Sequence, residues 1–555
     1  MITRPSLLAA LALCLTLGGA IHIDARRQAQ SSAASAPAAA PRLVVLLAID
    51  QFRSDYAEQY GKQWTRGLKR LFQTSAIFPL GAYPYGVTKT CAGHATIGTG
   101  SLPRIHGMVE NEWYDRTKRG TVTCTEDPDV MSVPFGGGKG TEKHSPRWLR
   151  IPTFADELRL QLPQLPRILS ISLKARSSIG LGGRGGPQTM IVWEEDDGTW
   201  ATSSAFTKEP WPEVDAYVRA HPVQALYGTR WTRFLPESAY LYDDDVPSEM
   251  GVKKFPHMLE SPKKVPDMSF VTRWERSPFS DEYIADMAIT LAGQLKLGQE
   301  ARTDLLSLSF SALDLVGHDY GPRSHEVQDV LARLDHQLGN LFDMLDKTVG
   351  PSRYVVAFSA DHGVPPIPEQ AAALGMNAGR FTSGEVRRVL QSVLTSAFGE
   401  GTYVAHVSSP NISFAPGVIA RIEAQPDLKQ MIASALLAIP GASRVYWGSD
   451  IAAPAATDDP ILGSLRMSYY PGRSGDLALV PRPYWIMQAD GTTHGSPYEF
   501  DRRVPVVLMG AGIKPGRYLS AATPADLVPT LAWLTGITLA HTDGRVLTEA
   551  LVRQP

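Results

Sequence analysis

The segment RLVVLLAID, residues 42–50, is a continuous apolar run that ends in an acidic residue. Such a run is typical of a strand that is buried on both faces of a parallel sheet, and it places Asp50 at the strand's C-terminal end. Four further runs of this kind follow, at residues 167–176, 304–314, 353–361 and 504–512. Four of these five runs end in, or just before, polar residues that could bind a metal or an anion.

Helical patterns lie between several of these predicted strands, at residues 281–297 and 324–349, and a third at 523–534 begins with the cap-like pair Thr523-Pro524. Strands that alternate with helices predict an α/β fold with a mostly parallel central sheet flanked by helices. Ligands in such folds bind beyond the C-terminal ends of the strands. Two long regions, about 180–279 and 365–493, do not follow the alternation, and we expect insertions that cap the active-site end of the sheet.

The N-terminal residues have the pattern of an export signal. Arg4 supplies the positive flank, residues 7–17 the apolar core and residues 18–20 the small side chains for cleavage. A signal-anchor is the alternative, but this apolar core is short for a membrane span. We therefore expect a periplasmic or secreted protein with a signal peptide over residues 1–25, an Ala/Ser/Pro linker over 26–41 and a catalytic domain over 42–555.

The charge of the chain is nearly balanced. Its 54 basic and 56 acidic residues give a formal net charge of −2, so there is no overall attraction to nucleic acid or to an anionic membrane, and any recognition of anions must be local. No apolar run after the N-terminus reaches the length of a membrane span. We expect small-molecule partners, no nucleic acid, no membrane span in the mature chain and a monomer.

The segment YGVTKTCAGHATIGTGSLPRIHGMVENEWYD, residues 85–115, contains a candidate nucleophile, Thr90. It follows a turn at Gly86 and precedes a run of small residues, 92–96, that can begin a helix. Backbone N–H groups at a helix N-terminus favour a bound anion, so a threonine placed there can attack a phosphorus centre. Threonine is a poor nucleophile at neutral pH and no base is adjacent in the sequence. We therefore expect a metal, gathered from elsewhere in the fold, to activate the hydroxyl.

Cys91 and Cys124 are the two cysteines outside the predicted signal peptide. In an oxidising compartment, a disulfide between them would brace the loop after Thr90. Two free, buried thiols are the alternative, and the sequence leaves both open.

Acidic and histidine residues recur after the apolar runs. Taken singly, each has an ordinary explanation as a cap, a local hydrogen-bond partner or a surface histidine, but their joint pattern in one α/β domain favours a metal hydrolase. Carboxylate oxygen with neutral imidazole suits Zn²⁺, with Mn²⁺ or Co²⁺ as substitutes. Together with Thr90, the six ligands are enough for two tetrahedral ions, an arrangement that serves phosphoryl transfer. The candidate ligands are Asp50, Asp314, His318, Asp361, His362 and His494.

These motifs resemble those of the alkaline phosphatase superfamily. Within it, the chain is most similar to the nucleotide pyrophosphatase/phosphodiesterase-like branch and its periplasmic alkaline phosphatases with a threonine nucleophile. The resemblance covers the chain from about Arg42 to the C-terminus, and the motifs follow the family's order. It rests on LLAID, TKTCAGHATIGTGSLPRIHGMVEN, LDLVGHDYG, SADHG and TTHG.

The resemblance implies a role for each candidate residue. Thr90 would be the nucleophile that forms a phospho-enzyme, and Asn111 would donate its amide to a phosphate oxygen beside the backbone N–H of Cys91. Sulfatases share the scaffold but need a C/S-x-P-x-R motif, which is missing after Thr90. One zinc ion, which also contacts Thr90, would be held by Asp50, Asp361 and His362, and the other by Asp314, His318 and His494.

The segment SLKARSS distinguishes monoesters from diesters. In an extended segment Lys174 and Arg176 would point the same way and could reach the extra charged oxygen of a monoester together. The threonine-nucleophile alkaline phosphatases that the chain resembles have a Lys-x-Arg pair in this region with that role. We expect zinc-dependent hydrolysis of broad phosphate monoesters at alkaline pH with secondary diesterase activity.

Two other functions stay open at this point. The first is a phosphodiesterase or nucleotide pyrophosphatase, which would use the same nucleophile and metal ligands. The second, from a different class, is an exported non-catalytic protein that binds phosphate or nucleotides, and it predicts a missing ligand or nucleophile. The cytosolic cofactor-independent phosphoglycerate mutases of this superfamily are disfavoured by the export signal.

Overall fold

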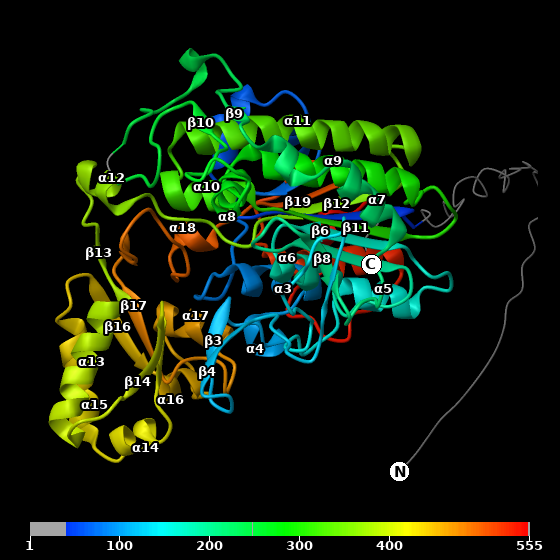
Figure 1. The fold of residues 1–555 in the computed structure, drawn as a ribbon. Helices are drawn as coiled ribbons and strands as arrows, with labels where there is room; N and C mark the ends of the chain where they lie inside the picture. The colour runs from blue at the N-terminus through cyan, green and yellow to red at the C-terminus, as the bar shows by residue number, and fades with distance from the viewer. Residues whose placement is uncertain (1–39, 247, 553–555) are drawn as a thin grey trace, which may run out of the picture. The chain divides into compact units, whose positions relative to one another are not determined.

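The structure, a computed structural model, describes residues 40–246 and 248–552 of the chain (Figure 1). The predicted signal peptide and residues 26–39 of the predicted linker lie outside the described residues. Among the described residues, no helix combines the length and the apolar character that a membrane crossing requires.

A ten-stranded sheet forms the centre of the fold, in the order β20-β2-β19-β12-β1-β11-β6-β7-β8-β5. Its five middle strands run parallel: β12 (Tyr354–Ser359), β1 (Leu43–Ile49), β11 (Asp304–Phe310), β6 (Ile168–Ser172) and β7 (Thr189–Glu194). The predicted α/β fold with a mostly parallel sheet is therefore confirmed. Antiparallel pairing is confined to the flanks, which consist of β19 (Val506–Gly510), β2 (Ala76–Phe78), β20 (Gly516–Arg517), β8 (Trp200–Ser203) and β5 (Ser132–Pro134).

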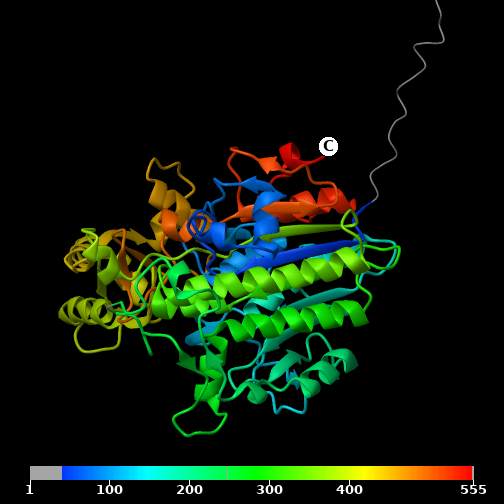
Figure 2. The same cartoon turned by 90° about the horizontal axis from the view of Figure 1, so that it is seen from above.

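Strand β1 explains why the sequence 43–49 is apolar at every position. All seven of its residues are buried, and alternate side chains enter two separate hydrophobic cores, one on each face of the sheet. Helices α9 (Pro278–Gln294) and α11 (His325–Thr348) cover one face and lie over the sheet in Figure 2. The other face is covered by α3 (Thr90–Thr99), α5 (Phe154–Gln161), α6 (Ala175–Gly182) and α19 (Leu527–Thr535).

The register of the sheet brings the ends of its central strands to one level. Ile49 pairs with Phe310, and Ala48 pairs with Ser359. Because these strands are parallel, the residues that follow each of them emerge at the same edge. This edge carries the candidate site.

The three predicted helices are present with small shifts. Helix α9 begins at Pro278, three residues before the predicted start. Helix α11 begins after Ser324, whose hydroxyl accepts the N–H of Val327 at 3.1 Å. The third starts as a short 3₁₀ turn, η4 (Pro524–Asp526), behind a Thr523 capping box and continues as α19.

The first predicted insertion begins later than expected. Residues 180–203 include β7, which pairs in parallel with β6, and β8, which extends the same sheet. Gly180 and Gly182 are the last glycines of α6. A Cβ on Gly180 would lie 2.9 Å from that of His94 on α3, so the close packing of these two helices requires a glycine there. The rest of the region contacts α11, where the Trp231 indole donates to Asp329 at 2.7 Å. It contains α7 (Pro212–Ala220), η2 (Val223–Leu226), β9 (Arg230–Trp231), η3 (Glu237–Ala239), β10 (His257–Met258) and α8 (Met268–Glu275).

The second region, 365–493, forms a subdomain with its own hydrophobic core, yellow to orange in Figure 1. Its four-stranded antiparallel sheet has the order β14-β15-β17-β16, with β14 (Val404–Ser408), β15 (Asn411–Phe414), β17 (Leu477–Pro481) and β16 (Ala442–Trp447). Its other elements are α12 (Pro368–Ala373), β13 (Gly379–Phe381), α13 (Ser383–Phe398), α14 (Val418–Glu423), α15 (Pro426–Leu437), α16 (Gly448–Ala452), α17 (Pro460–Ser468) and β18 (Trp485–Met487).

Shorter elements complete the described chain. Two of them, β3 (Glu112–Asp115) and β4 (Gly120–Thr123), form a hairpin at the C-terminal end of the candidate nucleophile segment. The others are α1 (Tyr56–Tyr60), η1 (Gly61–Gln63), α2 (Gly67–Gln73), α4 (Pro103–His106), α10 (Ala312–Tyr320), α18 (Glu499–Arg502) and η5 (Thr548–Ala550).

Candidate active site

Thr90 is the first residue of α3, and the whole helix is buried. The preceding residue, Lys89, is extended, so the chain turns sharply into the helix at Thr90. Gly93 lets the helix approach the end of β12, because a Cβ there would lie 2.4 Å from the backbone oxygen of Asp361. The helix that begins with the candidate nucleophile is thereby packed against one of the candidate metal ligands.

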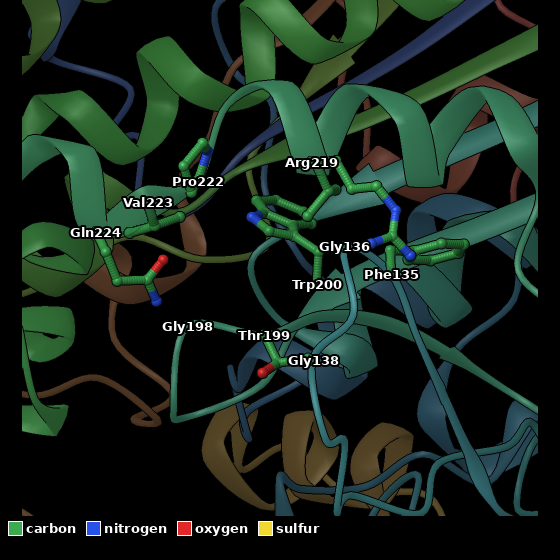
Figure 3. A pocket seen from close by; sticks show the side chains of 11 residues that line it. Phe135, Gly136, Gly138, Gly198, Thr199, Trp200, Arg219, Pro222, Val223 and Gln224 are labelled. Atoms are coloured by element: carbon green, nitrogen blue, oxygen red, sulfur yellow. The ribbon is translucent and has the colours of Figure 1, made fainter.

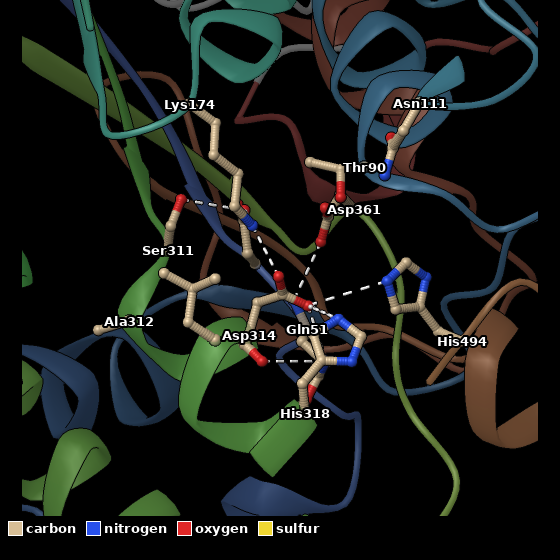
Figure 4. Close-up of polar contacts among 12 residues, drawn as sticks. Gln51, Thr90, Asn111, Lys174, Ser311, Ala312, Asp314, His318, Asp361 and His494 are labelled. Carbon is tan, nitrogen blue, oxygen red and sulfur yellow. Dashed lines mark hydrogen bonds and ion pairs between the residues drawn. The ribbon is translucent and has the colours of Figure 1, made fainter. Parts of the chain in front are cut away.

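The predicted ligands come together at the C-terminal edge of the sheet (Figure 4). Asp50 follows β1, Asp361 and His362 follow β12, and α10 carries the Asp314 and His318 pair. The His318 Nε2 lies 3.3 Å from Asp314 Oδ1, and the His494 Nε2 lies 3.9 Å from the same oxygen. His362 Nε2 lies 3.1 Å from Asp361 Oδ2. Its ring stacks on that of His494, with centroids 3.4 Å apart.

The three candidate imidazoles are held in one tautomer. In each, Nδ1 faces a backbone carbonyl, which can only accept, so Nδ1 carries the proton and Nε2 keeps its lone pair. The carbonyls belong to Thr492 for His318 at 2.7 Å, Gly363 for His362 at 3.0 Å and Thr88 for His494 at 2.7 Å. Backbone support of this kind is how proteins orient histidine ligands toward a metal.

The residues fit a divalent cation. Asp361 Oδ2 and His362 Nε2 are buried and have no hydrogen-bond partner among the described residues. Buried polar atoms of this kind call for a partner, and a carboxylate with neutral imidazoles is a donor set suited to zinc. Two groups each place three ligand atoms within 4.8 Å of one another: Asp314, His362 and His494, and Asp50, His94 and Asp361.

This grouping differs from the one that the resemblance implied. His362 lies between the two sets, since it contacts Asp361 and also groups with Asp314 and His494. His94 was not predicted. Its Nδ1 faces the carbonyl of Thr90 and its Nε2 the hydroxyl of Ser309, both at 2.9 Å. Because both of its nitrogens have protein partners, we treat His94 as a residue that supports Thr90. The spacing Thr90-x-x-x-His94, one helical turn, could have indicated this.

Gln51 is a second residue that the sequence did not single out. Its φ of +64° is the left-handed conformation. This turn aims its N–H at Asp361 Oδ1, at 3.0 Å, and its side-chain amide at Asp314 Oδ1, at 2.7 Å. Gln51 thus connects carboxylates that follow two different strands. No sequence signal beyond its position next to Asp50 indicates this role.

Lys174 contacts a carboxylate from each predicted metal set. Its Nζ lies 2.9 Å from Asp50 Oδ2 and 2.6 Å from Asp314 Oδ2. Burial disfavours the ammonium, yet the charges of Asp314 and Asp50 raise the pKa of Lys174. Burial likewise opposes ionisation of Asp50, but the charges of Lys174 and His94 lower its pKa.

Lys174 and Arg176 do not lie on one face of a strand, so that prediction is wrong. Strand β6 ends at Ser172, Lys174 is the N-cap of α6, and Arg176 lies in the first turn of that helix. Both residues nevertheless border one cavity of about 700 Å³, which Asn111 also lines. The three predicted phosphate-binding side chains therefore share a cavity for a different reason than expected.

Asn111 is oriented by the chain itself. The backbone N–H of Cys91 donates to Asn111 Oδ1 at 2.9 Å. The amide nitrogen of Asn111 therefore lies on the side of Thr90 in Figure 4. The Cys91 N–H, predicted to bind phosphate, is engaged by this contact. Cys91 and Cys124 form a disulfide that braces the same segment.

The subdomain 365–493 docks on the nucleophile segment. The hydroxyl of Ser468 accepts the backbone N–H groups of Gly86 and Val87 at 3.1 and 3.0 Å. Asn411 donates to Glu110 Oε1. Arg473 donates to the carbonyl of Trp148 at 2.8 Å, and its guanidinium lies over the rings of Trp113, Trp148 and Tyr470.

A second cavity, of about 380 Å³, lies beside Trp200 and Gly136 (Figure 3). None of the predicted site residues lines it. Its one charged side chain, Arg219, is paired with Asp215 at 2.7 Å. We therefore assign the active site to the edge of the sheet and not to this cavity.

Known proteins match this chain over most of its length. The family model described as type I phosphodiesterase / nucleotide pyrophosphatase matches residues 44–502. Alkaline phosphatase PafA of Elizabethkingia meningoseptica is 30% identical over 92% of this chain and 95% of its own length. Alkaline phosphatase PhoV of Synechococcus elongatus is 28% identical over 97% and 99%.

Solved structures agree with this match. The crystal structure of wild-type PafA aligns with a TM-score of 0.83 at 29% identity, over 92% of this chain and 99% of that chain. Murine ectonucleotide pyrophosphatase/phosphodiesterase 5 shares the fold, with a TM-score of 0.53 at 14% identity over 90% and 97%. These relatives indicate hydrolysis of phosphate esters. The chain belongs to the type I phosphodiesterase/nucleotide pyrophosphatase family, within the alkaline phosphatase superfamily.

Proposed function

We propose that the protein is an alkaline phosphatase that hydrolyses phosphate monoesters through a phospho-threonine at Thr90 and releases inorganic phosphate. Diesters would be slower substrates of the same site. The observation that carries the proposal is that the helix beginning at Thr90 packs against Asp361 at the edge where the candidate ligands gather, and that Asn111, Lys174 and Arg176 share one cavity.

The proposed cofactor is a pair of zinc ions, with Mn²⁺ or Co²⁺ as substitutes. The residues that would hold them are Asp50, Asp361, His362, Asp314, His318 and His494. When bound, such ions act as Lewis acids that favour the ionised forms of a hydroxyl or a water and neutralise charge on phosphoryl oxygens. The Lys174 ammonium forms ion pairs with both Asp50 and Asp314, so a bound metal cation would compete with it for these carboxylates.

The chemistry of the chain itself takes two steps. Thr90 Oγ1 gives up its proton and forms a bond to phosphorus as the bond to the alcohol oxygen breaks, and the alcohol leaves with a proton. Water then attacks the phosphorus, the bond to Thr90 breaks, and phosphate is released. Asn111, Lys174 and Arg176 would hold the phosphoryl oxygens throughout, which is electrostatic positioning.

The preference for monoesters rests on charge. A monoester dianion carries a charged oxygen where a diester has a second organic group. Lys174 and Arg176 are two cations beside one cavity, and a charge-assisted hydrogen bond is stronger than a neutral one. They would therefore favour monoesters, whereas the nucleophile and the ligands serve both substrates. A phosphodiesterase is the second candidate, and the name of the matching family favours it.

The non-catalytic alternative predicts that a ligand or the nucleophile is missing. Every candidate is present in the sequence, and the two clusters that include five of the six proposed ligands speak against this alternative. We further propose export to the periplasm or the outside of the cell, on the pattern of residues 1–25, and a monomer as the working form.

The test is hydrolysis of an aryl phosphate monoester and of the matching diester at alkaline pH. Each is measured before chelation, after chelation and after zinc is restored. Chelator-sensitive, zinc-restored activity that is much higher on the monoester is expected. Preference for the diester would move the protein to the phosphodiesterase branch. No activity on either ester with zinc bound would support the binding-protein alternative.

A further inference from the structure

The cavity that contains Lys174 and Arg176 has an acidic wall. Six of its lining side chains are carboxylic acids, whereas its lysine and arginine side chains are three: Lys143, Lys174 and Arg176. At about 700 Å³, the cavity has the size of a small-molecule site. The acids are Glu112, Glu126, Glu142, Glu194, Asp196 and Glu275.

Three of these acids, Glu194, Asp196 and Glu275, form no ion pair with another described residue, and the first and last of them lie side by side. Glu194 ends β7 and is 5% exposed, and no donor among the described residues reaches its Oε1. Its polar neighbour is Glu275, the last residue of α8, which is another carboxyl group. Neither forms an ion pair with a lysine, arginine or histidine of the described chain. The pKa of Glu194 is raised, mainly by burial and secondly by the charge of Glu275. The other three acids have basic partners: Glu142 pairs with His144 at 2.7 Å, Glu126 with Lys118 at 3.3 Å and Glu112 with His406 at 3.9 Å.

We propose that Glu194 and Glu275 bind a cationic group of the substrate, so that the preferred monoesters are those whose alcohol carries an ammonium group. This inference rests on the proposed function, because it places the phosphate at Lys174, Arg176 and Asn111 in the same cavity. A phosphate dianion there neutralises the two cations and leaves the wall negative. An ammonium group then supplies the donor that Glu194 Oε1 lacks and the positive charge that the carboxyl pair lacks.

A divalent cation is the competing occupant. Within the described residues, clusters of three ligand atoms that could hold an ion occur only at the candidate metal centre. Glu194 and Glu275 belong to neither cluster, so they present no preformed metal site. A charged group that brings its own hydrogen-bond donors matches this pair better than a bare ion, which needs several converging oxygens.

The test compares non-hydrolysable phosphonates by calorimetry with the zinc-loaded full-length protein. Aminoethyl-, aminopropyl- and aminobutylphosphonate are each compared with the alkylphosphonate of equal heavy-atom count, so that leaving-group chemistry plays no part. At least one amine should bind about tenfold more tightly than its isostere, as expected for one hydrogen bond to a charged group. Equal affinity at every chain length would overturn the proposal.

The E194Q/E275Q double variant should abolish that preference, since it keeps the shape and removes the charge. Glu195→Gln is the matched control. Glu195 is adjacent and buried but does not line the cavity, and it accepts from Ser132 and the Thr141 N–H at 2.6 Å. The Glu195→Gln variant should keep the wild-type ratio of aminoalkylphosphonate affinity to alkylphosphonate affinity. If this variant lost the preference for the amine as fully as the double variant does, the assignment would also be overturned. Turnover of an aryl phosphate, measured in parallel, reports separately on the proposed function.

Discussion

Cys91 donates its backbone N–H to Asn111 Oδ1 across 2.9 Å, and this bond decides which end of the Asn111 amide is free. Oxygen and nitrogen of an amide side chain are distinguished by their hydrogen bonds, and here the donor is a backbone N–H, so the contacting atom is the oxygen. The NH₂ group is therefore left on the side of Thr90 as a donor for a phosphoryl oxygen.

Asn111→Asp should consequently be worse than Asn111→Ala. Aspartate can still accept the Cys91 N–H, but it replaces the free donors with a carboxylate that repels phosphate. We expect kcat/KM on an aryl monoester to fall by about 10²–10³ in N111A, as for loss of an oxyanion donor, and further in N111D. Steady-state kinetics at saturating zinc measure both. Equal activities for wild type and N111D would remove Asn111 from the site.

Thr90→Ala should abolish turnover while the metal content stays that of the wild type. The substitution removes the hydroxyl and the γ-methyl group of Thr90, and the six proposed ligands are untouched. Elemental analysis of the purified variant measures the metal, and a coloured aryl phosphate measures turnover. Thr90→Ser keeps a hydroxyl and should retain a phospho-enzyme that acid quenching and mass spectrometry detect. A fully active T90A would rule out Thr90 as the nucleophile.

Loss of Lys174 or Arg176 should change substrate preference. Each removed cation should lower monoester kcat/KM by about 10- to 100-fold, the effect of one hydrogen bond to a charged group, and lower diester hydrolysis much less. The ratio of the two rates is the readout. Lys143→Ala is the control, because Lys143 borders the same cavity and its ammonium donates to the carbonyl of Pro128 at 3.3 Å, with no ion pair among the described residues. Equal losses on both substrates in K174A and R176A would reject the selectivity argument.

The sequence predicted those parts of the fold that follow from local pattern. An unbroken apolar run marks β1 because both of its faces are buried, and its terminal acid predicts the position of Asp50. The same rule located β11 and β12 and the ligands that follow them. These predictions need only the period of a strand and the direction of a parallel sheet.

Other features depend on contacts that no local pattern contains. Gln51 reaches Asp314, 263 residues away, only because its backbone takes a left-handed turn. Arg176 was placed in a strand because the alternation of residues cannot show that the chain turns into α6 after Ser172. The predicted insertion at 180–279 starts too early because α6, β7 and β8 continue the central fold there, and Gly180 serves the close packing of α6 against α3.

Gly93→Ala tests the packing of the nucleophile helix against β12. The added Cβ would lie 2.4 Å from the Asp361 oxygen, so the helix must move away from the ligands. We expect destabilisation of about 1–3 kcal/mol from overpacking, together with lower kcat. Thermal unfolding and kinetics measure the two effects.

The control for this variant is Gly293→Ala. Gly293 lies within α9, and a Cβ there meets no atom within 4 Å. Because alanine favours the helix, this variant should be neutral or more stable by up to about 1 kcal/mol, with unchanged kinetics. If G93A behaved in the same way, the close contact would not constrain the site.

Glu110 should make stability depend on pH where the subdomain docks. It is buried and accepts from Asn411, and burial, opposed in part by Lys89, raises its pKa from the usual 4.5 to about 7. Between pH 4.5 and about 7 the Glu110 carboxyl group is therefore protonated in the folded protein and ionised in the unfolded chain. The stability that this bound proton contributes is lost as pH rises through about 7. Glu110→Gln keeps an acceptor for Asn411 without the charge.

The midpoint of thermal unfolding, measured for wild type and E110Q across this range, should show the wild type losing stability relative to the variant as pH rises from about 4.5 to about 7. Above about pH 7 the difference between the unfolding midpoints of wild type and E110Q should stay constant, since Glu110 is then ionised in both the folded and the unfolded protein. Glu112→Gln removes an exposed charge two residues away that adds only a minor part to the raised pKa of Glu110, so this variant should still lose stability across the same window. Parallel profiles for wild type and E110Q would mean that the carboxyl group is ionised in the folded protein throughout, with Lys89 compensating the cost of burial.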